Sequence, residues 1–213
     1  MSSLITRGNA AGTGSVTLES PNTNSDYTLS LPAQTATIAT LTTPSFGTTI
    51  GVGGATAAAS GAGITFPATV SASSDANTLD DYEEGSWTPE IRLGGAAAGV
   101  TYSGNRNGRY TKIGRIVTVS FFMELTNKGS STGSLTVVTL PFVPYNAVGY
   151  PYYVGTVANE SDMASMPTGV FCLAWSDSNL YIRSNSATAW TAVTNSNLTN
   201  SSKFYCTITY EAV

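Results

Sequence analysis

The sequence predicts an all-β protein, and three observations indicate this fold class. Apolar residues alternate with polar residues in several short segments, as expected of half-buried strands. Turn-forming Gly, Asn and Ser residues separate these segments. No segment sustains the period of 3.6 residues that marks an amphipathic helix. We therefore expect an N-terminal β-hairpin anchor and an extended stalk, followed by an antiparallel β-sandwich of the jelly-roll type.

The first predicted region, residues 1–45, contains a β-hairpin. Apolar and polar residues alternate over 16–18 and again over 27–31, and the turn-forming run 21–26 lies between them. A further short strand is expected over 36–41. A piece this small cannot bury a core of its own, so we expect it to pack against another chain.

The second predicted region, residues 46–84, is an extended stalk or linker, because Gly, Ala, Ser and Thr dominate it. Charge also divides the chain here. Residues 1–84 carry one basic and seven acidic side chains, a net charge of −6. Residues 85–213 carry eight basic and six acidic side chains, a net charge of +2. Neither part is basic enough to favour nucleic-acid binding.

The third predicted region, residues 85–213, is the β-sandwich head. Its clearest strand spans 115–125, where every second residue from Val117 to Leu125 is apolar and the residues between them are mostly polar. The same reasoning predicts further strands over 135–140, 169–175, 179–183 and 203–210.

Several functions are disfavoured by composition. Histidine is absent, which removes the commonest general base and the commonest metal ligand, so we expect no metal and no cofactor. Cys172 and Cys206 each lie in an apolar segment and are expected as small buried side chains, and whether they form a disulfide stays open. No apolar stretch approaches the roughly 18 residues of a membrane-spanning helix, so we expect no membrane insertion. The N-terminus lacks a signal-peptide core, so we expect synthesis in the cytoplasm.

Segments along most of the chain are similar to known proteins. The most specific segment is 78–89, with the sequence Thr-Leu-Asp-Asp-Tyr-Glu-Glu-Gly-Ser-Trp-Thr-Pro, and others are 108–119, 128–133, 140–142 and 208–211. These segments resemble tail-fibre and related structural proteins of tailed bacteriophages. Upstream, 14–18 and 22–32 resemble the N-terminal repeats of marine phage fibres.

The resemblance implies a structural, non-enzymatic protein of the virion that works as a homotrimer and is made in the host cytoplasm. Region 1–45 would attach it to another virion protein, of the tail or the capsid. The head would contribute to host-surface recognition or adsorption as part of a tail fibre. Two alternatives stay open: a head fibre or decoration protein of the capsid with a weak receptor role or none, and a small glycan-degrading spike.

Charged residues gather on both sides of the start of the predicted head. The acidic run lacks the alternating ligands and bend-forming Gly of a calcium loop, so we expect ion pairs with nearby basic residues rather than a metal site. The acidic residues are Asp80, Asp81, Glu83 and Glu84, and the basic ones are Arg106, Arg109, Lys112 and Arg115. The arginines also suit the carboxylates and phosphates of bacterial glycans, and an ordinary polar strand edge is the alternative.

Aromatic side chains are frequent after residue 145, and sugars stack their C–H faces on such rings. Trp190 lies in a polar loop and is a candidate for receptor contact, whereas Trp175 lies in an apolar strand and is expected in the core. Packing in the core or between subunits is the alternative for the whole set. The candidate receptor contacts are Tyr150, Tyr152, Tyr153 and Trp190, together with Arg106 and Arg109.

Glycan hydrolysis would need two carboxyl groups roughly 5–9.5 Å apart across the scissile bond. The candidates are Glu124, Glu160, Asp162 and Asp177, and no spacing singles out a pair among them. No nucleophile-elbow motif accompanies the many Ser and Thr residues. We therefore expect no enzymatic activity.

Overall fold

The structure is a computed structural model that describes residues 26, 49–58, 61–146, 152–159, 162–165, 167–186 and 188–213. The chain divides into residues 1–45 and 46–213, and all elements below belong to the second part. Apart from residue 26, the predicted hairpin over 16–31 lies outside the described residues, and so does the predicted strand over 36–41.

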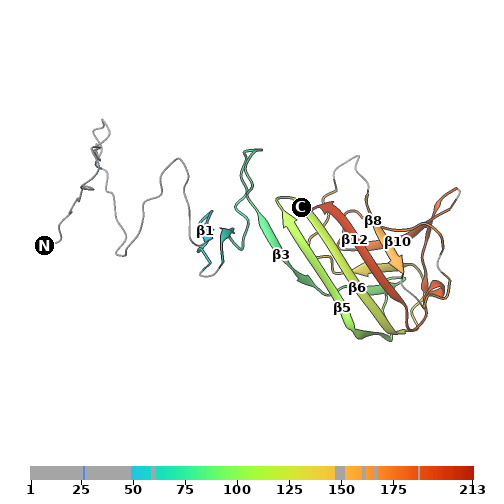
Figure 1. Cartoon of the computed structure of the whole chain (residues 1–213). Helices are drawn as coiled ribbons and strands as arrows, with labels where there is room; N and C mark the ends of the chain where they lie inside the picture. The colour runs from blue at the N-terminus through green and yellow to red at the C-terminus, as the bar shows by residue number, and fades with distance from the viewer. Residues whose placement is uncertain are drawn as a thin grey trace, which may run out of the picture. The chain divides into compact units, whose positions relative to one another are not determined.

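Ten described strands form one antiparallel sheet, which confirms the predicted all-β antiparallel fold (Figure 1). In chain order the strands are β3 (Tyr82–Trp87), β4 (Glu90–Leu93), β5 (Val100–Ile113), β6 (Ile116–Lys128), β7 (Leu135–Val138), β8 (Tyr153–Asn159), β9 (Val170–Ala174), β10 (Leu180–Asn185), β11 (Trp190–Ala192) and β12 (Lys203–Glu211). Across the sheet the order is β3-β5-β6-β12-β8-β9-β10-β7-β4, and β11 pairs with β10. A 3-10 turn, Asn195–Asn197, is the only helix in the part of the chain that the structure describes.

The sheet curls back on itself. Its two terminal strands, β3 and β4, are consecutive in the chain and are separated only by Thr88 and Pro89. The two halves of the sheet therefore face each other, and the expected sandwich is built from one curled sheet. Its core contains inward residues from both halves, for example Ile91 of β4 and Met123 of β6.

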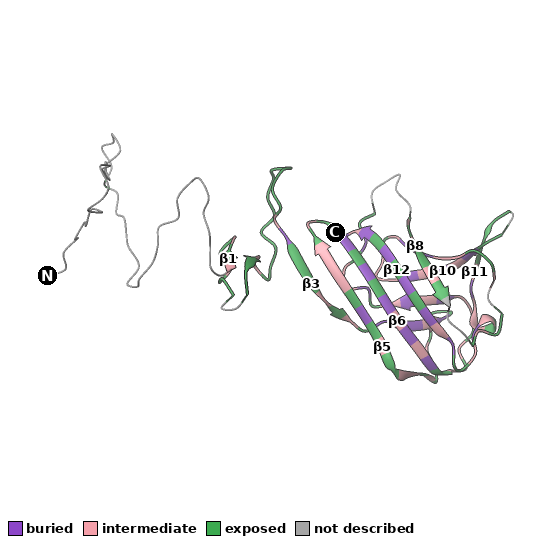
Figure 2. Cartoon of the chain, viewed as in Figure 1, coloured by how far each residue is buried: buried purple, intermediate pink, exposed green. Residues whose placement is uncertain are grey.

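Alternation of apolar residues predicts the central strands well. Buried and exposed residues alternate along β6 and β12, which lie side by side (Figure 2). Val117 pairs with Tyr210 and Val119 pairs with Ile208, and all four side chains face the core. Burial of one face fixes this register, because a shift by one residue would turn every apolar side chain towards solvent.

Two short strands lie within the range that the sequence assigns to the stalk. β1 (Thr49–Gly51) and β2 (Gly63–Thr65) form a parallel pair. β3 also begins inside this range, at Tyr82, and its ring lies 6.4 Å from the ring of Phe66. The main sheet thus starts three residues before the predicted start of the head, because β3 pairs with β5.

Residues 78–89 form β3 and the chain that enters it. Asp81 makes an ion pair with Lys112 of β5, and its backbone oxygen accepts a hydrogen bond from the Gly114 amide at 2.8 Å. Glu83 accepts a hydrogen bond from the Tyr110 hydroxyl. The segment therefore docks the edge strand onto the sheet, and two of its acidic side chains serve this purpose.

Candidate functional site

Five aromatic side chains form a continuous cluster on one surface of the head. Tyr152 precedes β8, Phe171 lies in β9, Trp175 follows β9, Tyr181 lies in β10 and Trp190 begins β11. The ring centroids of Tyr152 lie 5.1 Å from Trp175 and 5.6 Å from Trp190. Trp190 also lies 5.6 Å from Phe171, and Trp175 stacks on Tyr181 at 5.4 Å. We refer to these five residues as the aromatic cluster.

The period of two in β9 explains how the cluster forms on the outer face. Cys172 and Ala174 point into the core, so Phe171, Leu173 and Trp175 share the opposite face. Leu173 is only 3% exposed, although it is not part of the contiguous core cluster. The alternation along β9 therefore places Phe171 and Trp175 on the face opposite Cys172 and Ala174.

Solvent reaches part of the aromatic cluster. Trp190 is 52% exposed and Tyr152 is 40% exposed, whereas Phe171, Trp175 and Tyr181 are half-buried. The half-buried rings hold the two exposed rings in edge-to-face contact. The result is a preformed surface in which the exposed rings lose little conformational freedom when a ligand binds.

Polar groups adjoin the aromatic cluster on the β10 side. Asp177 Oδ2 accepts hydrogen bonds from the Tyr181 hydroxyl at 2.6 Å and from Asn179 Nδ2 at 2.7 Å. Burial, and then the hydrogen bond to Asp177, raise the pKa of Tyr181, so its hydroxyl stays protonated and donates. The Arg183 guanidinium lies 5.3 Å from the centre of the Tyr181 ring. The site thus combines stacking surfaces with fixed polar groups, a combination suited to a sugar.

Two predicted receptor contacts, Tyr152 and Trp190, lie in the aromatic cluster, while Tyr150 lies outside the described residues. Tyr153 is directed elsewhere: its hydroxyl donates to the Tyr145 backbone oxygen at 2.9 Å, and its ring lies 6.3 Å from Tyr210 of β12. The contacts of Tyr152 with Trp175 and Trp190, and those of Tyr153 with Tyr145 and Tyr210, therefore place the two rings on different surfaces.

The sequence does not predict three members of the aromatic cluster as exposed receptor contacts. Trp175 was expected in the core but is half-buried on the outer face, because it continues the outward set of β9. Tyr181 belongs to the aromatic set of the C-terminal half for which receptor contact or packing is predicted, but it is not singled out as a candidate, and Phe171 is outside that set. The sequence feature that could have predicted them is alternation, because Phe171 precedes the core residue Cys172 and Tyr181 follows the core residue Leu180.

The two candidate arginines lie on β5, away from the aromatic cluster in the sheet order. Arg106 packs over the Tyr102 ring at 4.2 Å and lies 3.8 Å from Glu90 Oε1. Arg109 is exposed and lines a shallow hollow of about 280 Å³ beside the rings of Phe122 and Tyr205. The predicted set of tyrosines and arginines therefore divides between two surfaces.

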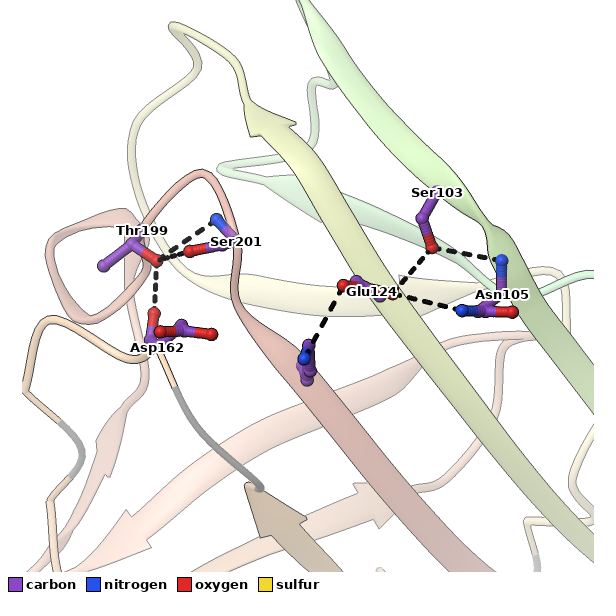
Figure 3. A network of polar contacts seen from close by, with 7 residues as sticks. Ser103, Asn105, Glu124, Asp162, Thr199 and Ser201 are labelled. Atoms are coloured by element: carbon purple, nitrogen blue, oxygen red, sulfur yellow. Dashed lines mark hydrogen bonds and ion pairs between the residues drawn. The ribbon is translucent and has the colours of Figure 1, made fainter.

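Glu124, one of the carboxylates considered for hydrolysis, is held by a polar network (Figure 3). Its Oε2 accepts hydrogen bonds from Ser103 Oγ at 3.0 Å and Asn105 Nδ2 at 3.3 Å, and its Oε1 lies 3.7 Å from Lys203 Nζ. The bond from Asn105, then that from Ser103, lower the pKa of Glu124. A glycosidase acid needs a raised pKa, so this environment opposes such a role for Glu124.

The described residues contain no group of three or more acidic or Cys side chains arranged to hold a metal ion. No helix among them has the length and hydropathy needed to cross a membrane.

Comparisons with known proteins find a distant structural neighbour. No protein-family model matches the chain, and no curated protein matches it. Among solved structures, the chain is similar to the crystal structure of the Dettilon tailspike protein, with 14% sequence identity and a TM-score of 0.47. The alignment covers 61% of this chain and 24% of that chain, so the present chain spans about a quarter of that protein's length.

Proposed function

We propose that this chain is a structural protein of a tailed-bacteriophage particle, of the tail-fibre type, and that its head contacts glycan on the host surface. The aromatic cluster carries the second part of this proposal. It presents Trp190 and Tyr152 to solvent on a layer of half-buried rings, and exposed apolar patches of this kind mark binding surfaces. The C–H faces of a sugar ring stack on such side chains, and the nearby polar groups fix its orientation.

The particle assignment is supported by the segment around β3. Residues 78–89 resemble phage fibre proteins, and in this chain they dock an edge strand through the Asp81–Lys112 ion pair and the Glu83–Tyr110 hydrogen bond. Their role is thus to join the preceding chain to the head, which suits a module that is carried on different particle proteins.

The proposed assembly is a homotrimer that region 1–45 attaches to another virion protein. Trimerisation would cover apolar surface and sheet edges such as β3, which pairs on one side only. Three heads presented together would bind a repetitive glycan with higher avidity than one head, without any new contact. The protein would act by binding alone and would catalyse no reaction.

The test measures binding of the full chain to purified capsule, lipopolysaccharide and teichoic acid of candidate host bacteria. Tryptophan fluorescence and calorimetry give the affinity. The Trp190→Ala variant should lose at least about tenfold in affinity, the effect expected of losing one anchoring aromatic residue. Tyr205→Ala is the matched control, because Tyr205 is an exposed aromatic residue of β12 outside the aromatic cluster. Equal losses in the two variants would refute a specific role for the aromatic cluster.

Location in the particle separates the tail fibre from the alternatives. Antibody-labelled virions viewed by electron microscopy should carry the label on the tail. A label on the capsid, together with no glycan binding, would replace the proposal with a head fibre or decoration protein. Shortening of the glycan chains after incubation with the protein would instead indicate a degrading spike.

A further inference from the structure

The two cysteines meet inside the head although their strands are not neighbours. The Sγ atoms of Cys172 and Cys206 lie 3.2 Å apart, and the two residues are 0% and 3% exposed. Cys172 belongs to β9 and Cys206 to β12, and β8 lies between these strands in the sheet. Strands separated by one other strand lie about 9.5 Å apart in a regular sheet, which is too far for two cysteine side chains to touch.

Gly155 of β8 makes the contact possible. It is the register partner of Cys172, so it lies directly beside that cysteine. A Cβ atom at position 155 would lie 2.7 Å from the Cys172 sulfur and 2.5 Å from Ile208 Cβ, distances that side chains do not tolerate. The absence of a side chain at Gly155 therefore leaves room for the sulfur of Cys172 to reach Cys206 across β8.

We propose that Cys172 and Cys206 are a modification site, at which an intramolecular disulfide forms when the protein meets a low-molecular-weight disulfide as oxidant. The thiolate of one cysteine attacks the oxidant, releases one small thiol and forms a mixed disulfide. The second cysteine then displaces the other small thiol. Two protein thiols are oxidised, one small disulfide is reduced to two thiols, and the two protons end on those thiols. The geometry at Gly155 carries this site independently of the proposed function.

Folding and local opening control when the bond forms. The hydrogen bond that the Cys206 thiol donates to Cys172, and then burial, raise the pKa of Cys206 well above its usual value, so little thiolate exists in the closed head. Oxidation of the folded protein is therefore slow and accelerates with rising pH. A chain made in a reducing cytoplasm keeps both thiols, and the bond forms after release into an oxidising medium.

The bond would tie together parts of the head that β8 now separates. Cys172 lies between Phe171 and Trp175 of the aromatic cluster, and Cys206 lies in β12, which pairs with β6. The cross-link joins residues 34 positions apart. It would therefore restrict the unfolded chain and hold β9, which positions the aromatic cluster, against β12.

The experiment uses the full chain, unfolded in denaturant and refolded in parallel with oxidised glutathione in excess or with a reducing agent. Oxidised samples should be lighter by two hydrogen atoms in intact mass spectrometry, and they should resist alkylation under denaturing conditions. Their Tm should exceed that of the reduced sample by roughly 5–10 °C, as expected for a cross-link of this span. The single variants Cys172→Ala and Cys206→Ala are controls and should retain one reactive sulfur.

Both thiols are accessible to the oxidant during refolding, so burial in the folded head cannot be the reason for a missing disulfide. Wild-type protein that refolds in oxidised glutathione with two free thiols, or with glutathione on both, would overturn the proposal. A disulfide that forms only at high protein concentration and links two chains would also overturn it. Each result is obtained without glycan or virion, so it is distinguishable from a failure of the proposed function.

Discussion

The indole ring of Trp87 lies over the backbone of Gly108, its register partner on the neighbouring strand, and leaves no room for a side chain there. A Cβ atom at position 108 would lie 2.3 Å from Trp87 Nε1. The same relationship occurs in reverse two residues away, where the ring of Tyr110 covers Gly85. Each strand of the β3–β5 pair thus supplies one glycine and one aromatic ring, and the reciprocal contacts pack the two strands closely together.

Replacement of Gly108 by alanine should displace the Trp87 ring, which also packs edge-on against Phe121 at 5.6 Å. We expect Gly108→Ala to lower the free energy of unfolding by about 1–3 kcal/mol, the usual effect of overpacking. Gly104→Ala is the matched control, because a Cβ there meets nothing within 4 Å. Urea unfolding monitored by tryptophan fluorescence gives both values, and equal stability of the two variants would contradict this account.

The ion pair between Asp81 and Lys112 should contribute more to stability than the pair between Glu90 and Arg106. Both side chains of the first pair are largely buried, whereas those of the second are more exposed and 3.8 Å apart. Asp81→Ala leaves the Lys112 ammonium without its carboxylate, which should cost about 3 kcal/mol or more. Glu90→Ala should cost less than about 1 kcal/mol. Denaturant unfolding of both variants tests this order, and a reversed order would refute it.

High pH should destabilise the head through Tyr110. The hydrogen bond to Glu83, followed by burial, raises the pKa of Tyr110 from 10.0 to about 12. The unfolded chain therefore releases this proton before the folded chain does, and stability falls as the pH rises from about 10 to 12. Ultraviolet titration of Tyr110→Phe should show one late tyrosine fewer than the parent protein, while Tyr210, whose pKa burial also raises, stays late. The urea midpoint of that variant should fall less steeply over the same range, and an unchanged slope would exclude Tyr110 as the cause.

The sequence predicts those strands whose inward residues are large and apolar. β6 and β12 bury Val, Phe, Met and Ile at every second position, so their period is visible without a structure. β5 is the longest strand and escapes this reasoning, because most of its residues are polar or glycine. On the core side of β5, the Trp87 ring from β3 fills the space beside Gly108. This packing can be recognised only once β3 and β5 are known to pair.

The aromatic cluster could be predicted only in part for a related reason. Tyr152 and Trp190 stand out in the sequence because they lie outside long apolar runs. Phe171, Trp175 and Tyr181 lie in or beside apolar segments, where a core residue and a residue of the outer layer look alike. Their assembly depends on the order β8-β9-β10-β11 in the sheet, and periodicity within single strands does not specify that order.

Glu124 should make the head sensitive to acid, and its two donors should contribute unequally. Its folded-state pKa lies below the usual 4.5, so this carboxylate stabilises the fold above that pH and the contribution is lost as the pH falls through the folded-state pKa. Because the hydrogen bond from Asn105 has the larger effect, Asn105→Ala should raise the pKa of Glu124 more than Ser103→Ala does. Carbon-detected NMR titration measures both pKa values, and in Glu124→Gln the urea midpoint should fall less as the pH decreases. A larger shift in Ser103→Ala would mean that the serine hydroxyl, rather than the amide, holds the carboxylate in its charged form.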